Sequence, residues 1–101
     1  MKTIKVFEII KLQYAVGCDD GELVCQQIIN SLIATNDVIV IDFEGVTNTL
    51  YEFLNCMYGR LFETYSESEL NKRIKFINYS MLTLDKLNGV REIALRYYGN
   101  K

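Results

Sequence analysis

The sequence predicts a small α/β domain built on a mixed, mostly parallel four-stranded sheet with about three helices. Segments rich in β-branched and aromatic residues alternate with segments whose apolar residues recur every three or four positions. The run VIVIDF at 38–43 is apolar almost throughout, which is typical of a central strand covered on both faces. Because the 101 residues contain no linker or low-complexity segment, we expect a single domain over residues 1–101.

The first strands and the first helix are expected before residue 38. TIKVFEII at 3–10 predicts a strand, and LQYAVG at 12–17 fits either a second short strand or a loop. A helix is expected from about Asp20 to Ala34, because its apolar residues have helical spacing and acids occupy its first turn. The VIVIDF strand then follows.

A second helix is predicted from Thr49 to about Tyr65 by apolar residues at intervals of three or four. Thr49 and Glu52 have the spacing of a capping box, in which each side chain bonds the backbone N–H of the other residue. Gly59 costs about 1 kcal/mol relative to alanine inside a helix, so it suggests the close approach of another element.

The last third of the chain predicts a strand between two helical segments. SESELNKR at 66–73 contains a Ser-x-x-Glu box and suggests a short extra turn of helix, and IKFINY at 74–79 predicts the next strand. Apolar residues from Leu84 to Tyr97 mark a final helix that Gly99 can end. This alternation implies right-handed crossovers and a functional site at the carboxyl ends of the strands.

The composition argues against several classes of function. Eleven Lys and Arg against thirteen Asp and Glu give a net charge of −2 without a long run of one sign, so we expect no nucleic-acid partner. The absence of histidine removes the commonest general base and the commonest metal ligand. We therefore expect no catalytic residues, no metal site and no cofactor.

Cysteine usage and the N-terminus bear on the compartment. Cys18, Cys25 and Cys56 match neither a CxxC redox pair nor a zinc-knuckle spacing, so we expect buried or half-buried free thiols in a reducing compartment. The N-terminus lacks a signal-peptide pattern, and no apolar run approaches the roughly 20 residues that a membrane-spanning helix needs. These observations predict a cytoplasmic protein with no membrane partner.

Acidic residues offer an alternative function. Asp42 and Glu44 lie two apart at the end of a predicted strand and therefore on one face, where they could hold a cation or act as acid and base. GCDDGE at 17–22 places Asp19 and Asp20 before a helix. A nucleotide- or metal-binding domain, or a small enzyme, could use these four acids. The structural interpretation is that Asp42 accepts hydrogen bonds from loop amides and that GCDDGE is a helix start.

Hydroxyl groups cluster before the second predicted helix. A phosphate at a helix N-terminus is favoured by the helix dipole and by free amides, so Thr47 and Thr49 are candidate phosphorylation sites. Simple helix capping by Thr49 is the alternative explanation of that residue.

The run VIVIDFEGVTNTLYEFLNCMYGRL resembles the strand–turn–helix core of STAS domains, the anti-sigma factor antagonist fold, and especially a STAS-like family of unknown function. The pattern of that family is an apolar strand, DF-x-G-V, a short turn and a Ser-Phe pair that opens a helix. DFEGV at 42–46 matches this pattern, Phe53 occupies the Phe position, and KRIKFINYS at 72–80 looks like the next strand. The resemblance covers residues 15–98.

The sequence departs from the family pattern at the switch position. Glu52 stands where the STAS-like pattern has Ser, and Tyr51 stands where anti-sigma antagonists carry the phosphorylated Ser. The final strand and helix of a full STAS domain are also missing, which implies a trimmed version. The resemblance implies a regulatory module that binds a partner, often a GHKL-type kinase, through the turn and helix after the central strand.

We therefore expect a non-enzymatic regulatory or adaptor module. Its partner is expected to be a protein, such as a GHKL-type ATPase or kinase or an anti-sigma-like regulator, and the chain itself is expected to be a monomer or a weak homodimer. The expected contact residues lie in the turn and helix after the central strand: Gly45, Thr47, Asn48, Thr49, Tyr51, Glu52, Asn55 and Tyr58.

Overall fold

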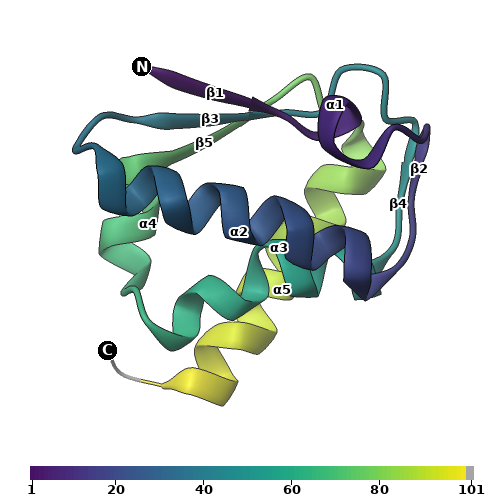
Figure 1. Cartoon of the computed structure of the whole chain (residues 1–101). Coiled ribbons are helices and arrows are strands. Elements are labelled where there is room, and N and C mark those ends of the chain that lie inside the picture. Colours follow the sequence, from purple (N-terminus) through teal and green to yellow (C-terminus); the bar gives the residue numbers. More distant parts are fainter. Residues whose placement is uncertain (100–101) are drawn as a thin grey trace.

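The computed structural model describes residues 1–99 as an α/β fold in which all strand pairs are parallel (Figure 1). The predicted alternation of strands and helices is confirmed. The elements in chain order are β1 (Lys2–Lys5), α1 (Val6–Ile10), β2 (Tyr14–Ala15), α2 (Cys18–Ala34), β3 (Ile39–Asp42), β4 (Asn48–Thr49), α3 (Tyr51–Met57), the 3-10 helix η1 (Gly59–Glu63), α4 (Glu67–Arg73), β5 (Ile74–Ile77) and α5 (Met81–Tyr98).

The strands form two small sheets rather than the one four-stranded sheet that was expected. β1, β3 and β5 pair in that order, and β2 pairs separately with β4. The reason is that the expected strand at 3–10 ends at Lys5, after which Val6 and Ile10 point into the core from the short helix α1. Residues four apart share one face of a helix, so this apolar spacing fits α1 as well as it fits a strand. The short helix α1 follows β1 directly. After it, Tyr14 and Ala15 form β2, which pairs with β4.

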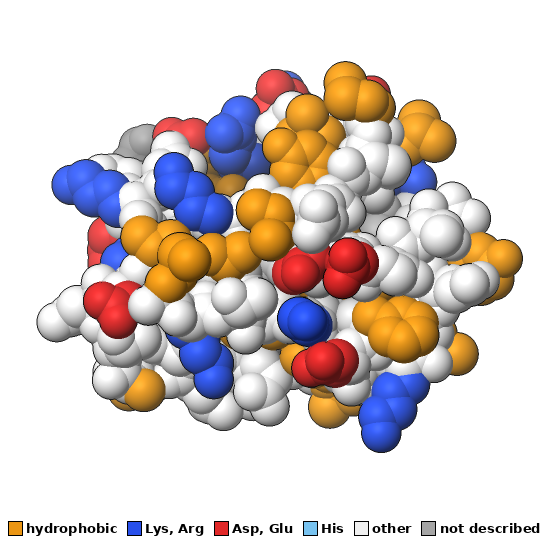
Figure 2. Space-filling view, turned by 90° about the horizontal axis from the view of Figure 1, so that it is seen from above, with side chains coloured by type: hydrophobic (Ala, Val, Ile, Leu, Met, Phe, Trp, Pro, Cys, Tyr) orange, Lys and Arg blue, Asp and Glu red, His pale blue; other side chains and the backbone are white. Residues whose placement is uncertain are grey.

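Within residues 1–99, the three-stranded sheet is covered by helices on one face only. Strands that are consecutive in the sheet and joined by right-handed crossovers have their helices on the same side, and α2 to α5 all lie on one side in Figure 1. Ile39 and Ile41 point into this core, whereas Val40 and Asp42 point to the opposite, open face. Figure 2 looks onto that face and shows charged side chains of both signs among hydrophobic ones.

The central strand β3 is buried on both faces, as expected, although helices cover only one of them. Val40 is only 7% exposed although it faces away from the helices. Thr3 of β1 and Lys75 of β5 lie on either side of it in the register, so their side chains shield it. A central strand can thus be apolar on both sides without a second layer of helices.

Helix α2 packs closely against α3, and glycine makes this approach possible. A Cβ atom at Gly21 would lie 2.5 Å from the carbonyl oxygen of Phe53 and 3.0 Å from Cβ of Cys56. The largest fully buried side chains include Ile28 of α2 and Phe53, Leu54 and Met57 of α3, together with Phe43.

The helix expected from Thr49 to Tyr65 is shorter and changes type. α3 ends at Met57, and η1 follows from Gly59. The close approach that Gly59 suggested is confirmed, because a Cβ atom there would lie 3.1 Å from Cγ1 of Val90 in α5.

The capping signals in the last third of the chain are confirmed. Ser66 and Glu69 form a complete capping box at the start of α4, and Gly99 ends α5 with a φ of 70°. Ser80 caps the start of α5 by accepting a hydrogen bond from the backbone N–H of Thr83. Within residues 1–99, none of the helices is long and apolar enough to cross a membrane.

Candidate functional site

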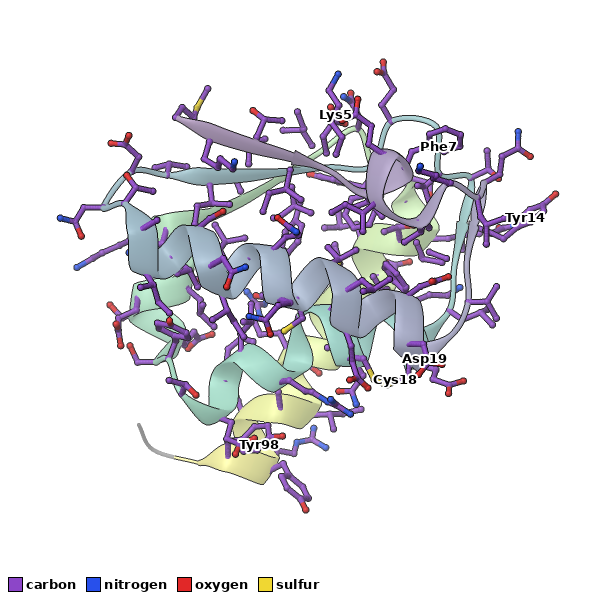
Figure 3. The ribbon with its side chains drawn as sticks, in the orientation of Figure 1. Lys5, Phe7, Tyr14, Cys18, Asp19 and Tyr98 are labelled. Atoms are coloured by element: carbon purple, nitrogen blue, oxygen red, sulfur yellow. A yellow bond between two sulfur atoms is a disulfide. The ribbon has the colours of Figure 1, made fainter. Side chains whose placement is uncertain are left out.

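The candidate site begins at the turn that follows β3. The backbone N–H of Val46 donates to the carbonyl of Phe43 at 2.9 Å, and Gly45 has a φ of 87°. This φ is typical of glycine at the third position of a type II turn, where other residues are strained. Gly45 also lies against Phe7 of α1, whose ring would be 3.3 Å from an added Cβ (Figure 3). The turn conformation and the contact with Phe7 therefore explain why the DFEGV motif has glycine at this position.

Asp42 anchors this turn to the end of β5. Its Oδ1 accepts hydrogen bonds from the backbone N–H of Glu44 at 2.8 Å and from Nδ2 of Asn78 at 2.9 Å. The backbone N–H of Phe43 donates to the carbonyl of Ile77 at 3.1 Å. The prediction that Asp42 accepts from loop amides is confirmed.

The four acids of the alternative function do not gather in one place. Asp19 and Asp20 lie in the first turn of α2, as expected for a helix start (Figure 3), Asp42 is buried in the turn network, and Glu44 is exposed. Across residues 1–99 no group of three or more Asp, Glu or Cys side chains is arranged to hold a metal ion.

The predicted capping box of Thr49 and Glu52 is wrong. Thr49 belongs to β4, and the N-cap of α3 is Leu50, which makes no side-chain capping hydrogen bond. Pairing of β4 with β2 directs the Thr49 side chain inward, where its hydroxyl lies 2.9 Å from that of Thr83. Lys86 Nζ donates to the Thr49 carbonyl at 2.6 Å. Glu52 is left exposed on α3.

The two candidate phosphorylation sites differ in access. Thr49 is 3% exposed, so its hydroxyl is closed to a modifying enzyme, contrary to expectation. Thr47 is exposed, and its backbone N–H donates to the carbonyl of Gln13 at 2.8 Å. Only Thr47 could be modified without unfolding the site.

Six of the eight expected contact residues are exposed, and three of them line a groove. Thr49 and Tyr58 are the two buried residues. Tyr58 packs edge-on against the rings of Phe62 and Phe76, because it lies one turn after buried Leu54 on the core face of α3. The groove measures about 440 Å³ and is lined by Tyr51, Glu52, Asn55, Val90 and Ile93.

Helix α5 forms the second wall of this groove, which the sequence analysis missed. The Tyr51 ring lies against Gly89, where an added Cβ would be 3.4 Å from its Cε1 atom, and Lys86 Nζ is 6.0 Å from the ring centroid. Tyr51 and Ile93 remain 53% and 59% exposed. Gly89, a glycine inside the amphipathic sequence of α5, could have indicated that Tyr51 of α3 approaches this helix closely.

The cysteines also differ from expectation. Cys18 and Cys56 form a disulfide with a Cα–Cα distance of 5.4 Å, and only Cys25 is a free, buried thiol. The two half-cystines are 38 positions apart, and they meet because α2 crosses α3 at Gly21. The disulfide removes the cysteine-based argument for a reducing compartment, so the cytoplasmic location stays a prediction.

A comparison with protein-family models matches the part of the chain that contains the turn after β3 and the α3 wall of the groove. Residues 20–81 match the model of the STAS-like domain of unknown function (DUF4325), and this span includes the turn after β3, α3 and β5. No curated protein and no solved structure matches the chain significantly. The match spans more than half of the chain and includes the DFEGV turn described above. The chain belongs to the family of STAS-like domains of unknown function.

Proposed function

We propose that this domain is a non-enzymatic regulatory or adaptor module that binds a protein partner in the groove between α3 and α5. The supporting observation is the groove itself, because Tyr51, Glu52 and Asn55 meet Val90 and Ile93 there. An exposed tyrosine beside aliphatic side chains is the kind of surface that provides anchor residues in protein interfaces.

The shape of the groove favours a protein segment as occupant. Two helices flank it, and its residues Tyr51 and Ile93 are more than half exposed. An apolar face of a helix laid between two helices is a common mode of peptide recognition. Tyr97 lies one turn beyond Ile93 on α5 and is also exposed, so the apolar surface extends along that helix.

Glu52 gives the groove a fixed negative charge. The family pattern has Ser at this position, and a helix cap would have been the simplest explanation of a glutamate there. Because Glu52 does not cap α3, its exposed carboxylate is available to a partner. We propose that it takes the place of a phosphorylated Ser, so that binding needs no modification. Family resemblance alone supports a GHKL-type ATPase or kinase, or an anti-sigma-like regulator, as the partner.

The test compares exposed apolar residues inside and outside the groove. Tagged wild-type chain and the Tyr51→Arg, Ile93→Arg and Ile33→Arg variants would be used to capture proteins from the native cell extract. Ile33 is 75% exposed on α2 and does not line the groove, so Ile33→Arg is the matched control. We expect a partner that wild type and Ile33→Arg retain and that both groove variants lose. A partner that survives both groove variants would exclude this groove as its site.

A second copy of the chain is the other occupant to consider. We propose a monomer or a weak homodimer, and sedimentation of the same four proteins distinguishes a self-association surface from a site for another protein. A dimer that only the groove variants dissociate would assign the groove to self-association and would contradict the proposal of a different partner.

A further inference from the structure

All three cysteines gather at the crossing of α2 and α3. Cβ of Cys56 lies opposite Gly21, and Cys18 and Cys25 lie three residues before and four residues after that glycine. Residues at these spacings share one face of a helix. The sulfur of Cys18 is bonded to Cys56, and Cys25 lines the same 280 Å³ pocket as Cys56 and Arg60.

The surroundings of Cys18 suit a reactive sulfur. Cys18 is half-buried in the first turn of the 17-residue helix α2 (Figure 3), where backbone amides favour negative charge. Arg60 Nη2 lies 3.6 Å from its Sγ atom. Glu22 Oε1 lies 3.4 Å from the same sulfur. The Glu22 carboxylate is also 3.5 Å from Arg60 Nη1, so the positive charge of Arg60 offsets the negative charge of Glu22. A partly exposed cysteine beside a cation at a helix N-terminus is typical of redox-sensitive sites.

The other two cysteines have different surroundings. Cys56 is 4% exposed, although the pocket gives small molecules a path to its surroundings. Burial raises the pKa of the Cys25 thiol above its usual value, against an opposing effect of Arg60, while Glu22 raises it further. Cys25 is therefore held as a neutral, weakly nucleophilic thiol.

We propose that Cys18 and Cys56 form a reversible redox site, in which Cys18 reacts first with a hydroperoxide and Cys56 resolves the product into the disulfide. The Cys18 thiolate attacks a peroxide oxygen and breaks the O–O bond, which gives a sulfenic acid and releases water or an alcohol. The Cys56 sulfur then attacks the Cys18 sulfur, and a water molecule leaves as the S–S bond forms. The two thiols supply the two electrons that reduce the peroxide.

Reduction of the bond does not require the core to open. Cys56 is buried at the α2–α3 crossing, but the half-buried residue Cys18 carries the other end of the bond nearer to solvent. A small thiol can attack the half-buried Cys18 sulfur, form a mixed disulfide and be released by a second thiol, which leaves both cysteines reduced. The site does not depend on the partner proposed above.

The test follows each cysteine of the full chain by mass spectrometry. The chain is reduced while folded, exposed to hydrogen peroxide with dimedone as a sulfenic acid trap, alkylated and mapped. In wild type we expect a Cys18–Cys56 disulfide that dithiothreitol reverses without loss of the circular dichroism spectrum. In Cys56→Ser we expect a dimedone adduct on Cys18, and in Cys18→Ser we expect almost none on Cys56 or Cys25. Arg60→Gln should slow disulfide formation about fivefold, as loss of a cation near 4 Å implies.

Several results would overturn the proposal. These are a disulfide that dithiothreitol cannot reduce until the chain unfolds, a disulfide that includes Cys25, or equal trapping on Cys56 and Cys18. The wild-type map and its rate are sufficient if a serine variant does not fold, because they report the pairing and its reversal directly.

Discussion

Thr49 and Glu52 show how the environment of a residue decides its role. The hydroxyl of Thr49 is directed toward Thr83 of α5 because β4 is held by β2, and Glu52 is consequently left without a capping partner. Ser66 and Glu69 have the same sequence spacing but are not held in a strand, and they form the full box. The same motif therefore has two outcomes in one chain.

The first prediction compares these two glutamates. Glu52→Ala should change the free energy of unfolding by less than about 0.5 kcal/mol, because the exposed carboxylate makes no capping bond. Glu69→Ala should lower it by about 1 kcal/mol, because the N-cap amide of Ser66 loses its acceptor. Urea denaturation of both variants measures the difference. Equal losses would mean that Glu52 does cap α3.

The second prediction concerns Tyr58 and high pH. Burial raises the pKa of the Tyr58 phenol above its usual value, an effect that Arg91 opposes and Glu67 reinforces. The folded chain thus holds this proton more tightly than the unfolded chain, so the free energy of unfolding should fall as pH rises above about 10. Tyr58→Phe lacks this proton and should show a smaller fall. Urea denaturation between neutral pH and the alkaline limit of folding gives both curves, and parallel curves would contradict the prediction.

The crossing of α2 and α3 depends on Gly21. Alanine in an unhindered helix interior would stabilise the chain by about 1 kcal/mol relative to glycine. An added Cβ at this position would instead lie 2.5 Å from the Phe53 carbonyl. We therefore predict the opposite sign, namely that Gly21→Ala lowers the free energy of unfolding by about 1–3 kcal/mol.

Gly17 provides the control for this third prediction. An added Cβ at Gly17 would meet no atom within 4 Å, so Gly17→Ala should have a small effect that reflects only the N-cap position. Thermal unfolding monitored by circular dichroism compares the two variants with wild type. An increase in stability for Gly21→Ala would show that α2 and α3 are not in tight contact.

The elements with a long periodic pattern could be predicted from the sequence. The helix expected at Asp20–Ala34 and the strand expected at 38–43 are both confirmed with small changes at their ends. Residues 6–10 were misassigned because β-branched composition favours a strand, whereas the buried positions Val6 and Ile10 belong to a helix turn. In short segments, tertiary packing decides whether the residues form a strand or a helix.

The site could be predicted only along one stretch of chain. The DFEGV motif located the turn and α3, but the second wall of the groove comes from Val90 and Ile93, some forty residues later in the sequence. Likewise the pairing of Cys18 with Cys56 depends on how α2 crosses α3. Contacts between segments that are distant in the sequence arise from tertiary packing. The periodicity of a single segment predicts its own secondary structure but not its packing partners.

For the whole molecule, the order β1–β3–β5 leaves one face of the sheet open. Val40 and Val24 are both buried, but Val40 lies on the open face and Val24 in the core cluster. Our fourth prediction is that Val40→Thr costs about 1 kcal/mol, because small shifts of the flanking Thr3 and Lys75 side chains on the face without helices let water reach the added hydroxyl. Val24→Thr should cost about 2 kcal/mol, because the core removes its hydroxyl from water and leaves it only a helix carbonyl that is already hydrogen-bonded. Urea denaturation measures both changes, and equal costs would indicate that the open face is covered.

We propose that a protein partner occupies the groove between α3 and α5 of this STAS-like domain. The most direct measurement is site-specific photo-crosslinking in the native cell, with a photoreactive amino acid at Asn55 in the groove or at the exposed Ile33 of α2. We predict a crosslinked species from position 55 that is absent from position 33 and is lost when Ile93→Arg is added. Crosslinking of the same protein from both positions, or none from position 55, would contradict binding of a partner in this groove.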